Sequence, residues 1–155
     1  MSVTDTVCCP GSTFSKIFEV CNVNYEFFIN GAKMAFEMVI NAFSKDDVET
    51  LKNLLSEKIL QGFSLAIEDR KTKELKLTTN LISIDKAEIL SAMLIDNQAS
   101  IVVKITSKQI NYVADKEQKI IEGTKDEISE INDIWTFKKD VKSPNPNWLV
   151  SATSS

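Results

Sequence analysis

Two residues of this chain have side chains suited to acid–base chemistry in an apolar setting, Asp133 and Tyr112. Asp133 stands two residues before Trp135, so the alternation of a strand would place both side chains on one face of a sheet. A carboxyl group buried beside tryptophan is expected to have a raised pKa and to act as a base, and a tyrosine on a neighbouring strand would donate a hydrogen bond. The pair indicates a small-molecule-binding or catalytic site of the isomerase or hydrolase type.

The composition narrows the chemistry that is available. Histidine is absent, which excludes imidazole bases, Ser-His and Cys-His nucleophile pairs, and most zinc or iron sites. The three cysteines, Cys8, Cys9 and Cys21, lie near the N-terminus in no metal-ligand spacing, and adjacent cysteines bridge each other only with strain. We therefore expect reduced thiols, no metal and no cofactor.

Length and charge bound the class of protein. The chain has 155 residues, of which 43% are hydrophobic and 26% charged, as expected for one globular domain with its own core. A formal net charge of -4 argues against a nucleic-acid partner, because phosphate neutralisation requires a basic surface. No run of ~20 apolar residues predicts a transmembrane helix, so any membrane contact is expected to be peripheral.

The periodicity of apolar residues predicts the elements that position these side chains. Apolar residues recur at intervals of three and four over residues 14–43, 48–55 and 56–73, which predicts helices in the first half of the chain. The first segment is either one long helix or two collinear pieces that meet near residues 22–24. After Lys76 the pattern changes to two-residue alternation, which predicts strands over residues 87–95, 100–112, 128–141 and 148–153.

Helices first and antiparallel strands second is the α+β arrangement, with N-terminal helices packed on one face of a curved antiparallel sheet. Such a sheet encloses a cone whose apolar mouth can hold a ligand. The side chains expected inside it are Phe36, Ile40, Phe63, Ile67, Met93, Val103, Trp135 and Phe137. By default these residues form a closed core, and the alternative is an open apolar pocket. Arg70, the only arginine, is a candidate partner for Asp133, in which case that carboxylate is structural.

The order of residues along the chain resembles a known family. The residues that carry the resemblance are Gly31, Ala32, Phe36, Ile40 to Phe43, Leu51, Leu54, Leu55, Phe63, Ala66, Ile67, Arg70, Ala87 to Ile89, Asp115, Gly123, Asp133, Trp135 to Phe137, and Asn147 to Thr153. Over about residues 25–153 the chain is similar to the C-terminal, membrane-binding domain of the family of translocase of the inner membrane, subunit 44, with its bacterial homologues. The resemblance implies a cone-shaped fold similar to nuclear transport factor 2, with a deep apolar pocket.

The resemblance also implies a function. It implies a non-enzymatic adaptor in protein translocation or membrane-protein assembly, peripheral on the cytoplasmic face of a bacterial inner membrane or on the matrix side in mitochondria. The implied partners are an anionic phospholipid or membrane surface and a membrane or translocation-related protein. The long N-terminal region that carries chaperone and channel contacts in mitochondrial members has no counterpart here, so we expect the membrane-binding module alone. Residues 1–24 are expected to form a leader with an amphipathic helix, and residues 25–155 the domain.

Helices that lead into this domain recruit it to lipid in the family, which implies a membrane-binding helix here. Its apolar residues are Phe14, Ile17, Phe18, Tyr25 and Phe28. The alternative is that these side chains pack on the domain or on a second copy of it. Two lysine groups, at residues 71, 73 and 76 and at residues 138, 139 and 142, are suited to lipid phosphates, although interspersed acids favour a solvated face.

Overall fold

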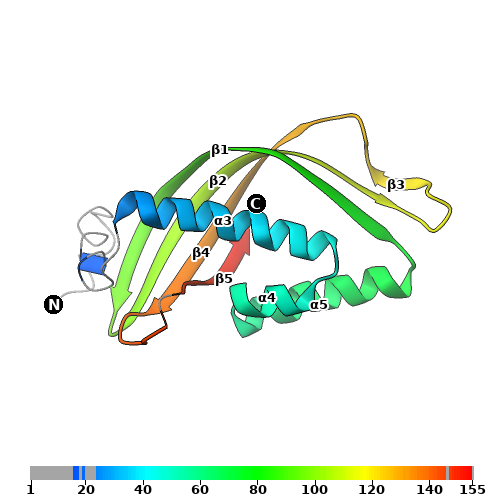
Figure 1. The fold of residues 1–155 in the computed structure, drawn as a ribbon. Helices are drawn as coiled ribbons and strands as arrows, with labels where there is room; N and C mark the ends of the chain where they lie inside the picture. The colour runs from blue at the N-terminus through cyan, green and yellow to red at the C-terminus, as the bar shows by residue number, and fades with distance from the viewer. Residues whose placement is uncertain (1–15, 18, 20–23, 146, 155) are drawn as a thin grey trace.

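In the computed structural model the described residues are 16, 17, 19, 24–145 and 147–154. The helices described in full are α3 (Tyr25–Ser44), α4 (Val48–Leu54) and α5 (Glu57–Thr72). The strands that follow them are β1 (Lys76–Ile95), β2 (Gln98–Ala114), β3 (Ile120–Gly123), β4 (Ser129–Asp140) and β5 (Leu149–Ser154). The predicted α+β order is confirmed, and α3 lies on the concave side of an arched sheet (Figure 1).

The strands form one antiparallel sheet in the order β1-β2-β4-β5, and β3 pairs with the far end of β2. β2 is therefore central: β1 pairs with it along nearly its whole length, while β4 and β3 share its other edge. The turn between β1 and β2 consists of Asp96 and Asn97, and Asp96 adopts a left-handed φ of 56°, as two-residue hairpins require. The opposite edge of the sheet, β5, is covered at Val150, whose carbonyl oxygen accepts a hydrogen bond from Ser56 N–H at 2.8 Å.

The arch of the sheet has a local cause in β1. The pairing of β1 with β2 shifts register three times, and each shift leaves one β1 residue without a partner: Ile82, Asp85 and Leu90. An extra residue of this kind bends its strand and increases the right-handed twist. The bulges therefore curve the long hairpin over α3, as Figure 1 shows.

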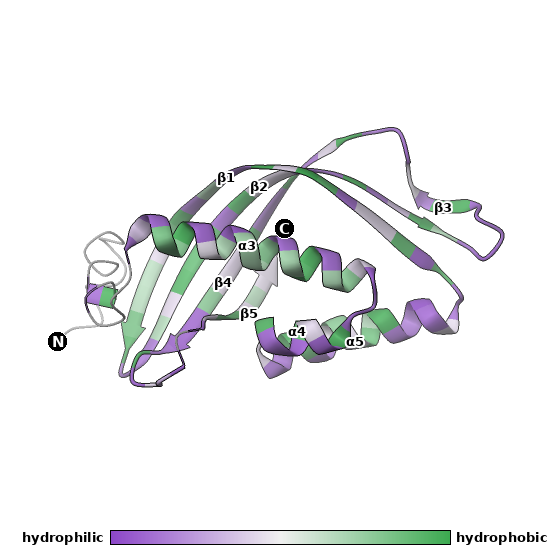
Figure 2. Cartoon of the chain, in the orientation of Figure 1, coloured by the Kyte–Doolittle hydropathy of each residue, from purple (hydrophilic) through white to green (hydrophobic). Residues whose placement is uncertain are grey.

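The core lies between α3 and the concave face of the sheet. Asn24 caps the helix, because its side-chain Oδ1 accepts a hydrogen bond from Phe27 N–H at 2.7 Å. The helix then buries residues at intervals of three and four, namely Phe28, Ile29, Ala32, Phe36, Val39 and Ala42. On β2 the alternate residues Ile101, Val103 and Ile105 are fully buried, and the alternation of apolar and polar residues along the strands is visible in Figure 2.

Two elements differ from the sequence prediction. β1 begins at Lys76 rather than at residue 87, because the bulges at Ile82 and Asp85 interrupt the two-residue alternation by which strands are recognised. β3 was not predicted: it has only four residues and is defined by its pairing with β2, with Tyr112 opposite Gly123. α3 begins at Tyr25, and residues 20–23 lie outside the described residues, so the choice between one long helix and two collinear pieces stays a prediction.

Candidate functional site

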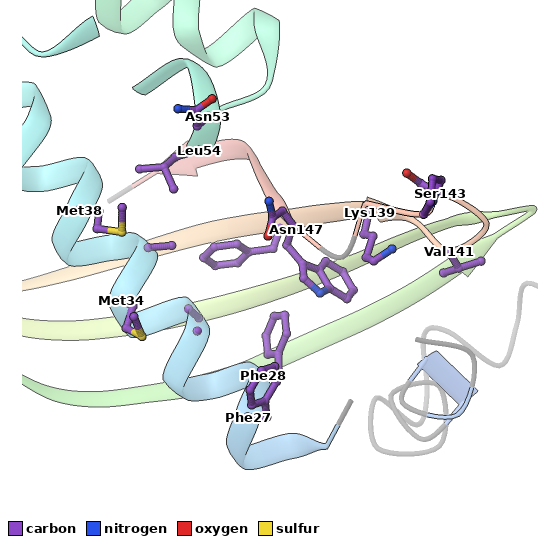
Figure 3. A pocket seen from close by; sticks show the side chains of 16 residues that line it. Phe27, Phe28, Met34, Met38, Asn53, Leu54, Lys139, Val141, Ser143 and Asn147 are labelled. Atoms are coloured by element: carbon purple, nitrogen blue, oxygen red, sulfur yellow. The ribbon is translucent and has the colours of Figure 1, made fainter. Parts of the chain in front are cut away.

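A hollow runs along one side of α3. It has a volume of about 690 Å³ and lies between that helix, the end of α4 and the segment that joins β4 to β5 (Figure 3). We call it the α3 groove. It is lined by Phe27, Phe28, Gly31, Ala32, Met34, Ala35, Met38, Asn53, Leu54, Phe137, Lys139, Val141, Ser143, Pro144, Asn147 and Trp148.

The floor of the α3 groove is aromatic and its rim is exposed. On the floor, the buried ring of Phe28 meets Trp148 edge to face at a centroid separation of 5.2 Å and Phe137 at 5.9 Å. On the rim, Phe27 is 71% exposed and Met34 is 63% exposed. Large apolar side chains in this position leave an apolar surface that is open to a ligand or a membrane.

A glycine in α3 makes room in the groove. Apart from its chain neighbours and the backbone of its own helix, a Cβ atom added to Gly31 would meet no atom within 4 Å, so the space beside this residue is open. Small side chains on a helix let a ligand approach the backbone closely.

The groove arises from a second apolar stripe on α3. Phe27, Gly31, Met34 and Met38 recur at intervals of four and three, beside the stripe that faces the core. Together the two stripes give α3 an apolar arc wider than a helix needs when it covers a sheet on one side only. The spacing was visible in the sequence, but the core stripe was the stronger signal and the second one was missed.

Polar groups contribute part of the lining of the α3 groove. Lys139 is the one charged residue among its described lining residues, and Asn53, Ser143 and Asn147 provide neutral polar atoms. In Figure 3, Lys139, Ser143 and Asn147 lie across the groove from Met34 and Met38 of α3. The groove is thus apolar along the helix and carries a single positive charge on the opposite side.

A second hollow, which we call the Asp133 hollow, has a volume of about 350 Å³. It is lined by Val39, Ile40, Phe43, Phe63, Asp133, Trp135, Thr153 and Ser154. Asp133 is half-buried there, and burial raises the pKa of its carboxyl group above the usual 3.8. No hydrogen bond or ion pair of this carboxylate occurs within the described ranges.

The predicted pocket residues are not gathered into one cavity. Ile40, Phe63 and Trp135 line the Asp133 hollow, and Phe137 lines the α3 groove. Phe36, Ile67 and Val103 are buried in the core and line neither hollow. The structure places Met93 outside the interior, 39% exposed, because its neighbour Ala92 faces the core and successive residues of a strand point to opposite faces.

The predicted catalytic pair is not assembled. Asp133 pairs with Ile105 of β2, and Tyr112 lies seven positions farther along that strand. At about 3.4 Å per residue this is on the order of 20 Å along the strand. Alternation also turns Tyr112 to the face opposite Ile105 and Asp133, so these side chains cannot act on one substrate atom. The Tyr112 ring instead lies 5.8 Å from the Lys125 ammonium group.

The predicted partner of Asp133 is also wrong. Arg70 Nη2 donates hydrogen bonds to the Phe43 carbonyl oxygen at 2.6 Å and to Asp46 Oδ1 at 2.7 Å. Its guanidinium carbon lies 4.4 Å from the centroid of the Phe43 ring. Arg70 thus ties α5 to the turn after α3, where Asp46 has a left-handed φ of 60°. An arginine prefers this planar, several-donor setting to a single carboxylate.

The residues of the predicted membrane-binding helix separate into three groups. Phe14 and Phe18 lie outside the described residues. Ile17 is fully buried in the core cluster and Phe28 forms the floor of the α3 groove, so both face the protein. Tyr25 is 48% exposed. In the part of the chain that the structure describes, no helix is both long enough and apolar enough to cross a membrane.

A polar row on the inner face of β2 was not anticipated. Ser107 and Gln109 are buried, and Gln109 Nε2 donates to Ser107 Oγ at 2.9 Å. Asn111 Nδ2 in turn donates to Gln109 Oε1 at 3.0 Å. The row satisfies its own hydrogen-bonding groups, so it marks the end of the apolar core rather than a binding site.

The chain is similar in sequence to a family of known proteins. A family described as the Tim44-like domain matches residues 21–155. A probable mitochondrial import inner membrane translocase subunit tin-44 of Caenorhabditis elegans is 23% identical over 109 residues, which are 70% of this chain and 26% of that protein. The mitochondrial import inner membrane translocase subunit TIM44-1 of Arabidopsis thaliana is 25% identical over 65% of this chain and 21% of its own length.

A bacterial relative and a solved structure complete the comparison. An uncharacterized protein of Rickettsia prowazekii (strain Madrid E) is 27% identical over 80% of this chain and 49% of its own length. The chain thus spans about a quarter or less of the mitochondrial relatives and about half of the bacterial one. The crystal structure of the intermembrane space region of the chloroplast protein ARC6 superposes with a TM-score of 0.59 at 16% identity, over 81% of this chain and 94% of that one. This likeness shows a shared fold.

Proposed function

Because this chain belongs to the Tim44-like domain family, we propose that it is a non-enzymatic adaptor domain that holds a translocation-related or membrane-assembly partner at a membrane surface. Two of its relatives are named as subunits of mitochondrial import translocases, which supports a role in translocation. The α3 groove is the observation that carries the proposal. We assign to it the apolar part of an anionic phospholipid, and place the domain peripherally on the cytoplasmic face of a bacterial inner membrane or on the matrix side in mitochondria.

The magnitudes favour insertion of an apolar chain over attraction to charge. Each lysine near an anionic surface contributes ~1 kcal/mol, and Lys139 is the one charge in the described lining of the groove. Each methylene group buried in an apolar site contributes ~0.8 kcal/mol, so four of them contribute ~3 kcal/mol. The exposed rim residues Phe27 and Met34 would add to this term when they contact the acyl region of the membrane. Lys139 then selects the anionic headgroup.

Cosedimentation with liposomes that contain or lack cardiolipin tests whether the exposed rim of the α3 groove contacts lipid. Phe27→Asp should reduce binding about tenfold or more, because a charge replaces an apolar contact with lipid. Leu65→Asp is the matched control, since Leu65 on α5 is 72% exposed and lies outside the groove. Both variants should keep the stability of the parent, because neither side chain is buried. Equal binding by the two variants would contradict the proposal.

A second pair of variants tests the groove itself. Gly31→Leu fills open space in the groove, whereas Gly62→Leu places the same side chain in open space on α5. We expect Gly31→Leu alone to weaken liposome binding.

Deletion of residues 1–24 tests the predicted N-terminal helix separately. The deletion removes Ile17 from the core, so thermal unfolding must be measured beside liposome binding. Full binding by a folded truncated chain would exclude that helix as the anchor.

A further inference from the structure

The Asp133 hollow has a composition that differs from that of the α3 groove. It combines three aromatic rings, from Phe43, Phe63 and Trp135, with a carboxylate at Asp133. The rings of Phe43 and Phe63 lie 5.1 Å apart between centroids at an interplanar angle of 63°, so they form a corner rather than a stack. The hydroxyl-bearing residues Thr153 and Ser154 of β5 complete the lining. The helices α3 and α5 and the strand β4 thus each supply one ring.

The Asp133 carboxylate is partly shielded from solvent, and no hydrogen bond or ion pair with another described residue compensates this burial. Asp133 is half-buried on the inner face of β4, and the one arginine of the chain is occupied by Asp46 and the Phe43 carbonyl. Burial of a charge without a compensating group is unfavourable. Burial raises the pKa of the Asp133 carboxyl group, and a cation that entered the hollow would compensate the carboxylate charge.

The rings determine which cation fits. The face of an aromatic ring attracts a cation, tryptophan most strongly, and apolar substituents on that cation gain contact with the rings at the same time. A hydrated metal ion gains neither, and the hollow supplies only one carboxylate, fewer oxygen ligands than Ca²⁺ or Mg²⁺ requires. We propose that the Asp133 hollow binds a small organic ammonium ion, whose charge pairs with Asp133 and whose alkyl groups contact Phe63 and Trp135.

Arg70 does not oppose this assignment. Its guanidinium covers one face of the Phe43 ring at 4.4 Å from the centroid, so that face is not available to a ligand. The ion pair with Asp46 at 2.7 Å compensates its charge. The cation is therefore expected to contact mainly Phe63 and Trp135, with Phe43 as an apolar wall.

The two tryptophans allow a direct test on the intact chain. Trp135 lines the Asp133 hollow and Trp148 lines the α3 groove, so their indole N–H signals in a ¹H,¹⁵N correlation spectrum report on the two sites separately. Trp148→Phe assigns the two signals. The probes are n-butylammonium chloride, the neutral n-butanol, and sodium chloride at equal ionic strength. We expect n-butylammonium to shift the Trp135 signal in a saturable manner while sodium chloride does not.

Substitutions separate charge from shape. Asp133→Asn keeps the size of the side chain and should weaken n-butylammonium binding about tenfold or more, because the charge pair is lost, while n-butanol binding stays the same. Phe63→Leu keeps an apolar wall but removes a ring, and should also weaken binding of the ammonium more than that of the alcohol. Equal affinity for n-butylammonium and n-butanol in the parent chain, or a Trp135 signal that neither probe shifts, would overturn the proposal. Liposome binding through the α3 groove would be unaffected by that result.

Discussion

Phe28 near the start of α3 and Trp148 just before β5 are far apart in the sequence, yet their rings meet edge to face with centroids 5.2 Å apart and planes at 76°. Phe28 also contacts Phe137 of β4 in the same geometry at 5.9 Å. The Phe28 ring thus joins α3 to β4 and to the segment that precedes β5. The floor of the α3 groove is built from this contact.

Phe28→Ala should therefore destabilise the domain by about 3 kcal/mol, since it empties a buried ring position and removes two aromatic contacts. The neighbouring Phe27→Ala is a matched control: Phe27 is 71% exposed and its removal should change the free energy of unfolding by about 0.5 kcal/mol or less. Urea denaturation monitored by circular dichroism measures both. Similar losses for the two variants would mean that Phe28 does not support the floor.

Arg70→Ala should destabilise the domain by about 2 kcal/mol, because it removes charge-assisted hydrogen bonds to Asp46 and to the Phe43 carbonyl and leaves that carbonyl without this donor. Arg70→Lys should recover only part of this loss, because an ammonium group cannot reproduce the planar guanidinium over the Phe43 ring. Denaturation midpoints rank the three proteins. Full recovery by lysine would show that charge alone matters at this position.

Two glycines should respond to alanine in opposite ways. Gly31→Ala adds a Cβ in open space inside a helix and should stabilise the chain by about 0.5–1 kcal/mol. Gly123→Ala should destabilise it by more than about 1 kcal/mol, because Gly123 has a φ of 78° and a Cβ there would overlap the Asn111 carbonyl oxygen. Thermal denaturation of the two variants gives the sign directly. A destabilised Gly31→Ala protein would show that the groove has no room at this point.

The Asp133 carboxyl group should make stability depend on pH. Burial raises its pKa in the folded chain above the unfolded value, so the folded state holds its proton more tightly. This contribution to stability is fully present below the unfolded pKa and is lost as pH rises through the folded pKa. Asp133→Asn removes the dependence, so the variant should gain stability relative to the parent between about pH 4 and pH 7. Urea titrations at both pH values test this, and an unchanged difference between the proteins would contradict it.

The sequence predicted the fold where one periodic signal dominated. The alternation of Ile101, Val103 and Ile105 defined β2, and intervals of three and four predicted the buried stripe of α3. The first half of β1 was missed because its bulges place Ile82 and Asp85 out of phase, and β3 was missed because a four-residue strand depends on its partner.

The site was predicted less well, for physical reasons. The identity of Trp135 and Phe137 as inner-face residues follows from alternation, and both are buried. Whether a buried stripe encloses a cavity depends on how far α3 stands from the sheet, which no spacing encodes. The Asp133–Arg70 pair failed because the arginine found two acceptors on a turn close to its own helix, a contact that only the packing of α5 against α3 creates.

The bulges of β1 affect how readily copies of this domain can pair through their sheet edges. β1 is an edge of the sheet, and an edge strand of 20 residues with a regular row of free N–H and C=O groups would be a template for pairing with another chain. The shifts at Ile82, Asp85 and Leu90 break that row into short pieces out of phase with one another. On the membrane surface proposed above, copies of the domain would be concentrated in two dimensions, which favours edge-to-edge pairing. The same irregularities that curve the sheet over α3 would therefore keep neighbouring copies separate.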